Sequence, residues 1–260
     1  MAVTTARERR ARIAALVEET DRVDVSVLAA RFGLTDTSIR RDLLLLEGQG
    51  RLKRIHGGAI ASHLALRQGV YGTKSREHRD EKRRIAAAAA DLIHPGDAVL
   101  FDSGTTVALV PAQVTHALRS RSSITAVTHS LPVIQEIGAW EGPHLVALGG
   151  LFLPDYEAFV GPQTVASLKG LSADLAFLGC DGLTIEAGIT TPHVLVAEVG
   201  ATMAARARRV VALADSSKLG RYGFTTIVPL GEVDVLITDS AASPEQLATI
   251  RAAGIEVIVA

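Results

Sequence analysis

Apolar residues recur at helical spacing three times within the first fifty residues of the chain. In the third segment Ile39, Leu43 and Leu46 fall at i, i+4 and i+7, which predicts a helix with one buried face. Thr35 stands just before it, where a hydroxyl oxygen can accept a backbone N–H of the first turn. Gly33 stands where the preceding helix would end. The pattern therefore predicts two helices joined by a tight turn.

The polar residues of this third helix point away from its buried face. At about 100° per residue, Thr37 and Arg41 lie opposite the apolar stripe, and Ser38 and Arg40 lie on its flanks. A guanidinium can bond to the O6 and N7 atoms of guanine or hold a phosphate. We interpret the segment as a DNA recognition helix, with a merely solvated polar face as the alternative.

A basic hairpin is expected after the recognition helix. Residues 51–55 alternate as a strand does, and Gly57-Gly58 can supply a tight turn before the next strand. Three helices and this hairpin make a winged helix-turn-helix. We expect its polar side chains near phosphates or the minor groove, namely Arg51, Lys53, Arg54 and His56. Leu44 and Leu45 lie off the buried stripe, and either complete this small core or contact a second subunit.

From His94 onward, short β-rich runs alternate with helical segments. This alternation is typical of a doubly wound, mostly parallel α/β sheet. The expected strands are residues 98–101, 124–128, 145–148, 174–178, 210–214, 235–238 and 256–259. The expected helices are 85–93, a segment from Thr106 to Leu118, 130–137, 192–207 and 244–252. The chain then divides into a DNA-binding domain (1–60), a linker (61–82) and an α/β domain (83–260). Lys82-Arg83-Arg84 is expected to be a solvated face at the start of a helix, with contact to DNA as the alternative.

Polar residues collect where the predicted strands end, and ligands of such sheets bind at the carboxyl ends of strands. One run, Asp102-Ser103-Gly104-Thr105-Thr106, joins a strand to a helix N-terminus. Its hydroxyls, backbone N–H groups and helix dipole favour a phosphate, although simple helix capping would produce the same letters. The other strand-end candidates are Thr128, His129, Ser130, Gly150, Asp181 and Lys218. We expect Lys218 to pair with a phosphate and Asp181 to accept a sugar hydroxyl.

Charge and composition sharpen this division. The 260 residues carry a net charge of -1, but residues 1–60 hold 11 Lys/Arg against 8 Asp/Glu, so the remainder carries -4. A basic front suits a nucleic-acid module. The single cysteine, Cys180, excludes a disulfide framework and is expected to pack or line the pocket. The chain has no apolar stretch of membrane-spanning length and no signal peptide, so we expect a cytoplasmic protein without a membrane partner.

Other chemistry finds little support in the sequence. The eight histidines are scattered and form no H-x-x-x-H or Cys/His set, so no metal site is expected. No G-x-G-x-x-G follows a predicted strand, which argues against a dinucleotide site, and no cofactor is expected.

The first sixty residues resemble a known family. The strings V-x-V-x-x-L-A-x-x-F-G-L-T-x-x-S-I-R-R-D-L and G-x-L-x-R-x-H-G-G-A are similar to the N-terminal domain of DeoR bacterial transcription regulators, with Ser38 where the family usually has Thr. The strings D-S-G-T-T, V-T-x-S, F-L-G-x-D-G and L-A-D-S-S-K-L-G resemble its C-terminal sensor domain. That domain is similar to ribose-5-phosphate isomerase, and the resemblance implies a phosphorylated sugar as effector. His129 stands where the family usually has Asn, and Gly200 where it usually has Lys, two places after Glu198.

An active sugar-phosphate isomerase is the rival hypothesis. The resembling isomerase segment reads D-G-A-D-E, whereas this chain reads Asp181-Gly182-Leu183-Thr184-Ile185 and lacks the second Asp. No lysine occurs between Lys169 and Lys218, so Glu198 remains a possible base or effector contact without its lysine neighbour. We therefore expect binding without turnover. A rear domain that only oligomerises is a further alternative.

These observations together predict a transcription regulator, specifically a repressor of a carbohydrate-use operon. Its partners would be a double-stranded DNA operator and a phosphorylated sugar effector. A single winged module buries little surface, so a homo-oligomer that spans two half-sites is expected. The effector would shift the relative placement of the DNA modules through unequal affinity for two arrangements.

Overall fold

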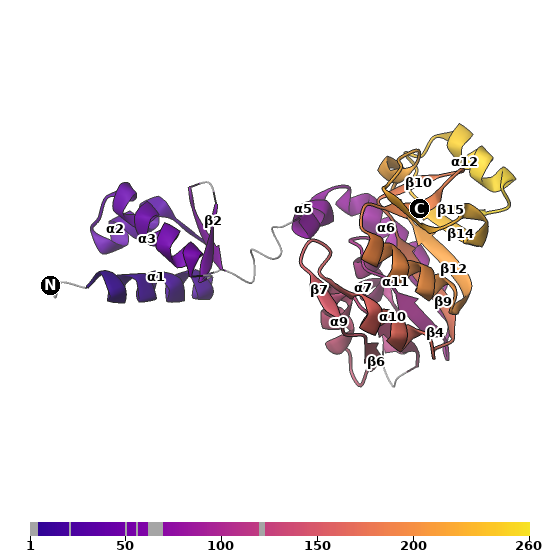
Figure 1. Ribbon diagram of the computed structural model, residues 1–260, viewed down its shortest axis with the longest axis horizontal. Coiled ribbons are helices and arrows are strands. Elements are labelled where there is room, and N and C mark those ends of the chain that lie inside the picture. The colour runs from indigo at the N-terminus through magenta and orange to yellow at the C-terminus, as the bar shows by residue number, and fades with distance from the viewer. Residues whose placement is uncertain (1–4, 21, 50, 56, 62–69, 120–122) are drawn as a thin grey trace. The chain divides into compact units, whose positions relative to one another are not determined.

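The computed structural model describes residues 5–20, 22–49, 51–55, 57–61, 70–119 and 123–260. The chain forms two compact units, Met1–Thr73 and Lys74–Ala260 (Figure 1). The boundary between them falls within one helix, α5 (Val70–Arg76). Residues 74–82, which the sequence assigned to the linker, are therefore part of the second unit, where they form the end of α5 and the beginning of α6 (Arg79–Ala90).

The first unit has the expected winged helix-turn-helix architecture. Helices α1 (Ala6–Thr20), α2 (Val25–Phe32) and α3 (Asp36–Gly48) pack on an antiparallel sheet of order β1-β3-β2. Its strands are β1 (Arg22–Asp24), β2 (Leu52–Ile55) and β3 (Gly58–Ala61). The predicted stripe Ile39, Leu43 and Leu46 is at most 2% exposed. Thr35 caps α3 by accepting the backbone N–H of Ser38, so the sequence pattern is confirmed here.

The second unit is built on a parallel sheet of order β15-β14-β12-β9-β4-β5-β6, among the residues that the structure describes. The bounds of these strands are β4 (Ala98–Phe101), β5 (Thr125–Thr128), β6 (His144–Ala147), β9 (Ala173–Gly179), β12 (Ala207–Leu213), β14 (Val235–Thr238) and β15 (Glu256–Val259). Chain order runs outward from β4 to β6 and then restarts on the other side of β4 with β9. The switch point of the sheet, where ligands of such folds bind, therefore lies between the carboxyl ends of β4 and β9.

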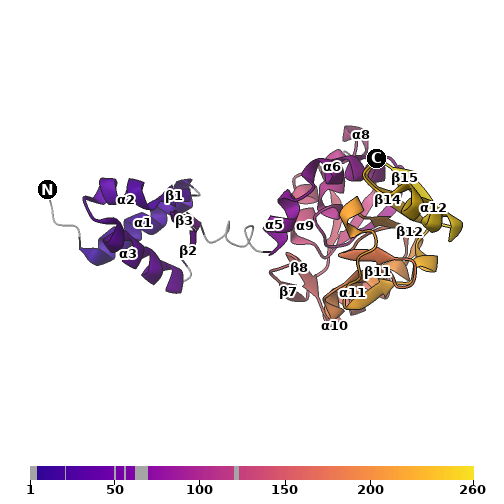
Figure 2. The same cartoon turned by 90° about the horizontal axis from the view of Figure 1, so that it is seen from above.

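Helices cover both faces of this sheet (Figure 2). Because side chains alternate along a strand, Val99 and Phe101 of β4 face one layer and Leu100 faces the other. The first layer contains α6 and α9 (Leu131–Gly138), and the second contains α10 (Pro162–Leu168), α11 (Val194–Ala204) and α12 (Pro244–Ala252). The doubly wound α/β prediction is confirmed.

Shorter elements surround the sheet. They are η1 (Val107–Leu109), α7 (Val110–Gln113), α8 (His116–Arg119), η2 (Ser216–Lys218), η3 (Leu230–Glu232), the hairpin β7 (Leu151–Leu153)–β8 (Ala158–Val160), and a sheet of β10 (Gly182–Thr184), β11 (Gly188–Thr191) and β13 (Thr225–Val228). The continuous helix expected up to Leu118 is wrong. The chain leaves the helix at Val114, whose ψ of 136° is extended, so three short pieces replace it. The expected helix 192–207 is also shorter, because β12 begins at Ala207.

Candidate DNA-binding face and sensor site

The predicted recognition face of α3 is open to solvent. Thr37, Arg40 and Arg41 are exposed, and Ser38 is half-buried against the Thr35 hydroxyl at 3.1 Å. The two guanidiniums are therefore accessible to a ligand of the helix. They form no hydrogen bond or ion pair with the parts of the chain that the structure describes.

An internal ion pair fixes α3 to the first helix. Asp42, only 5% exposed, accepts a 2.7 Å hydrogen bond from Nε of Arg9, and Nε of Arg10 lies 3.9 Å from its other oxygen. Sequence reasoning missed this contact because the two partners lie far apart in the chain. Leu44 and Leu45 are 51% and 44% exposed, so they do not complete the core of this unit.

The hairpin after α3 carries the expected cations, and a carboxylate of α3 holds two of them. Arg51, Lys53 and Arg54 are exposed, whereas His56 lies outside the described residues. The Glu47 carboxylate accepts the backbone N–H of Arg54 at 2.9 Å and its Nε at 2.7 Å, with Lys53 Nζ 4.0 Å away. The backbone and side-chain hydrogen bonds from Arg54 lower the pKa of Glu47.

A hollow of about 330 Å³ separates the helix from the hairpin. It is lined by Val25, Arg40, Leu43, Arg54, Ile55, Gly57 and Gly58. Gly57 adopts a φ of 81°, which explains the glycine at this turn, while Gly58 already belongs to β3. Two guanidiniums around a polar hollow form a surface suited to an anion such as a DNA phosphate.

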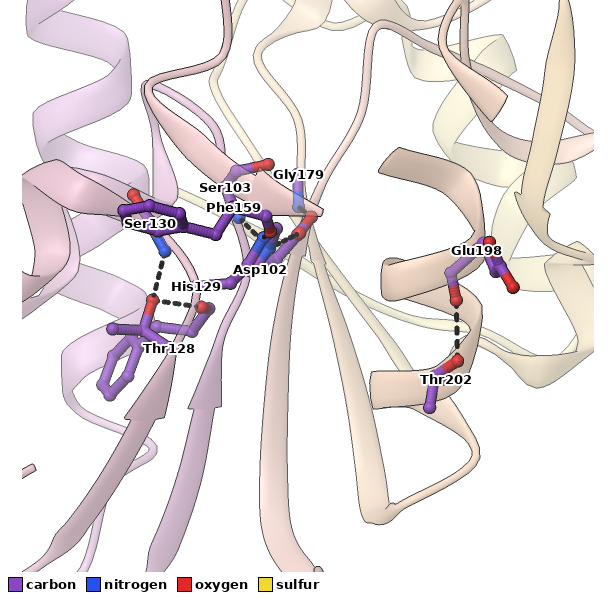
Figure 3. A network of polar contacts seen from close by, with 10 residues as sticks. Asp102, Ser103, Thr128, His129, Ser130, Phe159, Gly179, Glu198 and Thr202 are labelled. Carbon is purple, nitrogen blue, oxygen red and sulfur yellow. Dashed lines mark hydrogen bonds and ion pairs between the residues drawn. The ribbon is translucent and has the colours of Figure 1, made fainter. Parts of the chain in front are cut away.

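In the second unit, the ends of β4 and β5 meet in a buried network (Figure 3). His129 Nε2 lies 2.9 Å from Asp102 Oδ1 and accepts the backbone N–H of Ser103 at 3.1 Å. His129 Nδ1 donates to the carbonyl of Phe159 at 2.6 Å. The other carboxylate oxygen of Asp102 accepts the N–H of Gly179, the last residue of β9. The switch point therefore joins β4, β5 and β9 through one carboxylate and one imidazole.

One ring nitrogen of His129 donates and the other accepts. A carbonyl cannot donate, so the Nδ1 proton is committed to Phe159. Both His129 and Asp102 are at most 1% exposed, so the pair lies away from solvent. Both nitrogens of His129 bond within the protein.

Two hydroxyls beside this network have no hydrogen-bond partner among the residues that the structure describes. The Oγ atoms of Ser103 and Ser130 form no hydrogen bond within the described ranges, and the two residues are only 4% and 0% exposed, so water does not reach them from the surface. Thr128, by contrast, donates to the Phe101 carbonyl at 2.7 Å and accepts the Ser130 N–H at 3.0 Å. Buried polar atoms are rarely left unpaired, so the two serines mark a place where a ligand or water completes their bonding.

The other half of the site follows β9 and β12. Asp181 forms an ion pair with Lys74 of α5 and accepts the Thr191 hydroxyl at 3.0 Å. Lys218 is partly exposed and forms no ion pair with any residue within the described ranges. Desolvation is the main cause that raises the pKa of the half-buried Cys180 thiol to about 12. The charges of Asp181, Asp215 and Asp102 also raise this pKa, and the charge of Lys218 lowers it.

Lys82 was wrongly expected on a solvated face. It is 2% exposed, and its Nζ donates to the carbonyls of Lys74 at 2.5 Å and Glu77 at 2.8 Å. Burial is the main cause that lowers its pKa, with Asp215 opposing and Lys218 adding to the effect. The signal was present in the sequence, because Lys82 stands at i, i+3, i+4 and i+7 with Ile85, Ala86 and Ala89, on the buried face of α6.

The remaining predicted residues differ in their placement. Gly104 has a φ of 135° and packs on Gly179. Thr105 is partly exposed, Thr106 is buried, and Gly150 is exposed beside Val160. Glu198 is not part of the network: it is exposed on α11, and in Figure 3 its only drawn contact is its carbonyl accepting from Thr202 at 2.7 Å.

A separate cavity of about 320 Å³ lies between the β10–β11 hairpin and α12. Glu186 and Glu245 are among its lining residues, and none of the predicted effector residues lines it. Two carboxylates make this cavity unfavourable for an anion. Within the ranges that the structure covers, there is no cluster of three potential metal ligands and no helix long and apolar enough to cross a membrane.

Both halves of the chain match families of known regulators. Residues 9–64 match the DeoR-like helix-turn-helix domain, and residues 77–240 match the DeoR C terminal sensor domain. The chain belongs to the DeoR family of transcription regulators. It is 34% identical to the HTH-type transcriptional regulator GlpR of Haloferax volcanii over 251 residues, which cover 96% of each chain.

The chain is also similar to a second regulator and, in part, to an enzyme of known structure. The putative aga operon transcriptional repressor of Escherichia coli is 32% identical over 259 residues, covering 99% of this chain and 95% of the relative. Ribose 5-phosphate isomerase A of Methanocaldococcus jannaschii is 21% identical over 55% of each chain with a TM-score of 0.40. This likeness to the isomerase is too low to support an argument about function. As a DeoR regulator, the chain combines a DNA-binding domain with a sensor domain.

Proposed function

We propose that this DeoR regulator represses carbohydrate-use genes and that a phosphorylated sugar bound at the switch point of its second unit controls it. The observation that carries the effector proposal is the pair of unsatisfied serine hydroxyls, Ser103 and Ser130, at adjacent strand ends. Lys218, which lacks an ion pair within the described chain, supplies a cation, and Asp181 supplies a hydroxyl acceptor. A phosphate ester carrying several hydroxyl groups matches this set of donors and acceptors.

Residues 1–60 would bind DNA, and residues 83–260 would sense the sugar together with residues 74–82 of the same compact unit. The rest of the predicted linker, residues 61–73, would join the two. The exposed face Thr37, Arg40 and Arg41 would read bases, while Arg51, Lys53 and Arg54 would contact phosphates. A homo-oligomer would place two such faces on two half-sites. Binding without turnover is supported by Glu198, whose exposed position on α11 leaves the buried network without a general base from that helix.

A thermal-shift screen of the full-length protein tests the effector proposal. The panel contains ribose 5-phosphate, glucose 6-phosphate, fructose 6-phosphate and glycerol 3-phosphate, each beside its unphosphorylated parent. A ligand at about 100 times its dissociation constant stabilises by about 2.7 kcal/mol, so a clear rise in Tm is expected for one phosphate and not for its parent. The double variant Ser103→Ala/Ser130→Ala should abolish that rise. Equal shifts in this variant and the wild type would refute the assigned site.

DNA selection from a random pool tests the other half. Arg41→Ala should lose preference for the selected sequence, whereas Lys53→Ala should weaken binding to all duplexes and reduce the salt slope by about one. If Arg41→Ala retained full sequence preference, α3 would not be the reading helix.

A further inference from the structure

The ion pair between Lys74 and Asp181 lies beside the proposed effector site. Lys74 is in the last turn of α5. The boundary between the two compact units falls immediately before it, so α5 is the first helix that the chain forms on entering the sensor unit. Asp181 follows β9, one of the two strands that flank the switch point. A residue of the inter-unit helix is therefore bonded to a residue of the candidate ligand site.

The surroundings of this pair keep it together but leave it accessible. The Lys74 ammonium lies 5.8 Å from the centroid of the Tyr156 ring, a favourable distance for a cation–π contact. The second carboxylate oxygen of Asp181 accepts the Thr191 hydroxyl, which in turn lies 3.3 Å from the Tyr156 hydroxyl. The side chains of Lys74 and Asp181 remain 35% and 23% exposed. A small polar ligand can therefore compete for the carboxylate.

A second lysine holds the same end of α5. The buried Lys82 ammonium donates to the carbonyls of Lys74 and Glu77, the free acceptors at the C-terminal end of that helix. The charges of Asp215 and Lys218 act on Lys82 from the effector side. Lys82 therefore holds the backbone at the end of α5, and the side chain of Lys74 connects the same end to the candidate site through Asp181. Of the two contacts, the partly exposed Lys74–Asp181 pair is the one that a ligand can open.

We propose that the Lys74–Asp181 ion pair is a latch that the effector opens when a sugar hydroxyl donates to the Asp181 carboxylate in place of the Lys74 ammonium. This inference rests on the proposed function, because it assigns the hydroxyl-recognising part of the same site. Opening the latch removes the side-chain restraint on α5, and this carries the binding signal to the segment that leads to the DNA-binding unit. Because coupling is reciprocal, the latch opposes effector binding as much as the effector opposes the latch.

A ligand-free measurement tests the latch first. The affinity of full-length protein for a duplex selected from a random pool is compared among wild type, Lys74→Met, Asp181→Asn and the double variant. Both single variants should change DNA affinity in the same direction, by about two- to fivefold for a half-exposed pair, and the double variant should show no further change. Lys74→Arg should restore the wild-type value. Arg76→Met is the matched control, since Arg76 is an exposed cation of the same turn that bonds to no described residue.

The effector arm separates a latch from a direct ligand contact. Lys74→Met should bind the sugar phosphate that stabilises the wild type about two- to fivefold more tightly than the wild type does, since no ion pair has to be broken. The same ligand should then change the DNA affinity of this variant less than that of the wild type. Weaker effector binding by Lys74→Met would mean that Lys74 contacts the ligand and would refute the latch. If no sugar phosphate binds the wild type, the proposed function fails. Unchanged DNA affinity in Lys74→Met or Asp181→Asn overturns the latch whatever the panel shows.

Discussion

The buried Asp102–His129 pair permits a quantitative prediction for the sensor unit. His129→Leu keeps a side chain of similar size but removes the donor to Phe159, the acceptor of Ser103 N–H and the partner of Asp102. Removing one partner of a buried pair costs about 3–5 kcal/mol, because the other is left without compensation. Asp102 retains the Gly179 N–H on its second oxygen, so the lower part of that range is expected.

Urea unfolding followed by Trp140 fluorescence measures this cost. Trp140 is the single tryptophan of the chain and lies in the second unit, so its signal reports that unit alone. For a slope of about 2–3 kcal/mol/M, the midpoint should fall by about 1–2.5 M. His129→Asn retains one donor and one acceptor and should lose less than half as much.

A double-mutant cycle supplies the control. If the two residues are energetically coupled through their 2.9 Å contact, Asp102→Leu in the His129→Leu background removes a carboxylate that has already lost its partner. The double variant should then be at least about 1 kcal/mol more stable than the sum of the single effects implies. A midpoint shift below about 0.3 M for His129→Leu, or strictly additive losses, would show that the pair is not a coupled unit and would refute the reasoning.

Two further predictions concern single side chains. Glu47→Gln should tighten binding to any duplex by about two- to fivefold at low salt, as measured by fluorescence anisotropy, because Arg54 and Lys53 are released for phosphates. The pKa of Glu47 in the folded protein is lowered from 4.5, so the stability that its carboxylate contributes is present above pH 4.5 and is lost as the pH falls through the folded pKa. The difference in unfolding free energy between wild type and Glu47→Gln should therefore shrink on acidification, as measured by urea unfolding at several pH values. Cys180, with a pKa raised from 9.0 to about 12, should hold about a thousandfold less thiolate at pH 8 in the folded state than when unfolded. Its reaction with a disulfide reagent should accordingly be slow until urea is added, and rapid labelling of the native protein would contradict the raised pKa of this thiol.

Local patterns predicted most of the architecture, and the errors have identifiable causes. The parallel strands β4, β14 and β15 have the predicted bounds, because each is a short apolar run between turn residues. The hairpin β7–β8 and the strands β10, β11 and β13 were missed, because their pairing joins segments that carry little periodicity of their own. Three short helices, η1, α7 and α8, stand where one long helix up to Leu118 was expected, because the extended residue Val114 redirects the chain.

Lys82 shows how a charge can mislead a sequence reading. Its position on the apolar face of α6 favoured burial, but an ammonium is rarely buried without partners, and composition alone suggested solvent. The partners are two backbone carbonyls at the end of the preceding helix, which no residue pattern reveals. A lysine at a helical core position is therefore worth testing as a buried ligand for a helix C-terminus.

The sequence by itself determined the two-domain plan, the recognition helix with its cap and buried stripe, and the strand-end location of the polar residues. These follow from periodicity and capping, which act over a few residues. Only the tertiary structure decided which of those polar groups meet. It bonds His129 within the protein, brings Lys74 to Asp181, and leaves the hydroxyls of Ser103 and Ser130 without a partner in the described part of the chain. Such contacts join residues as many as 107 positions apart, and they form only when the sheet order brings the carboxyl ends of β4, β5 and β9 together.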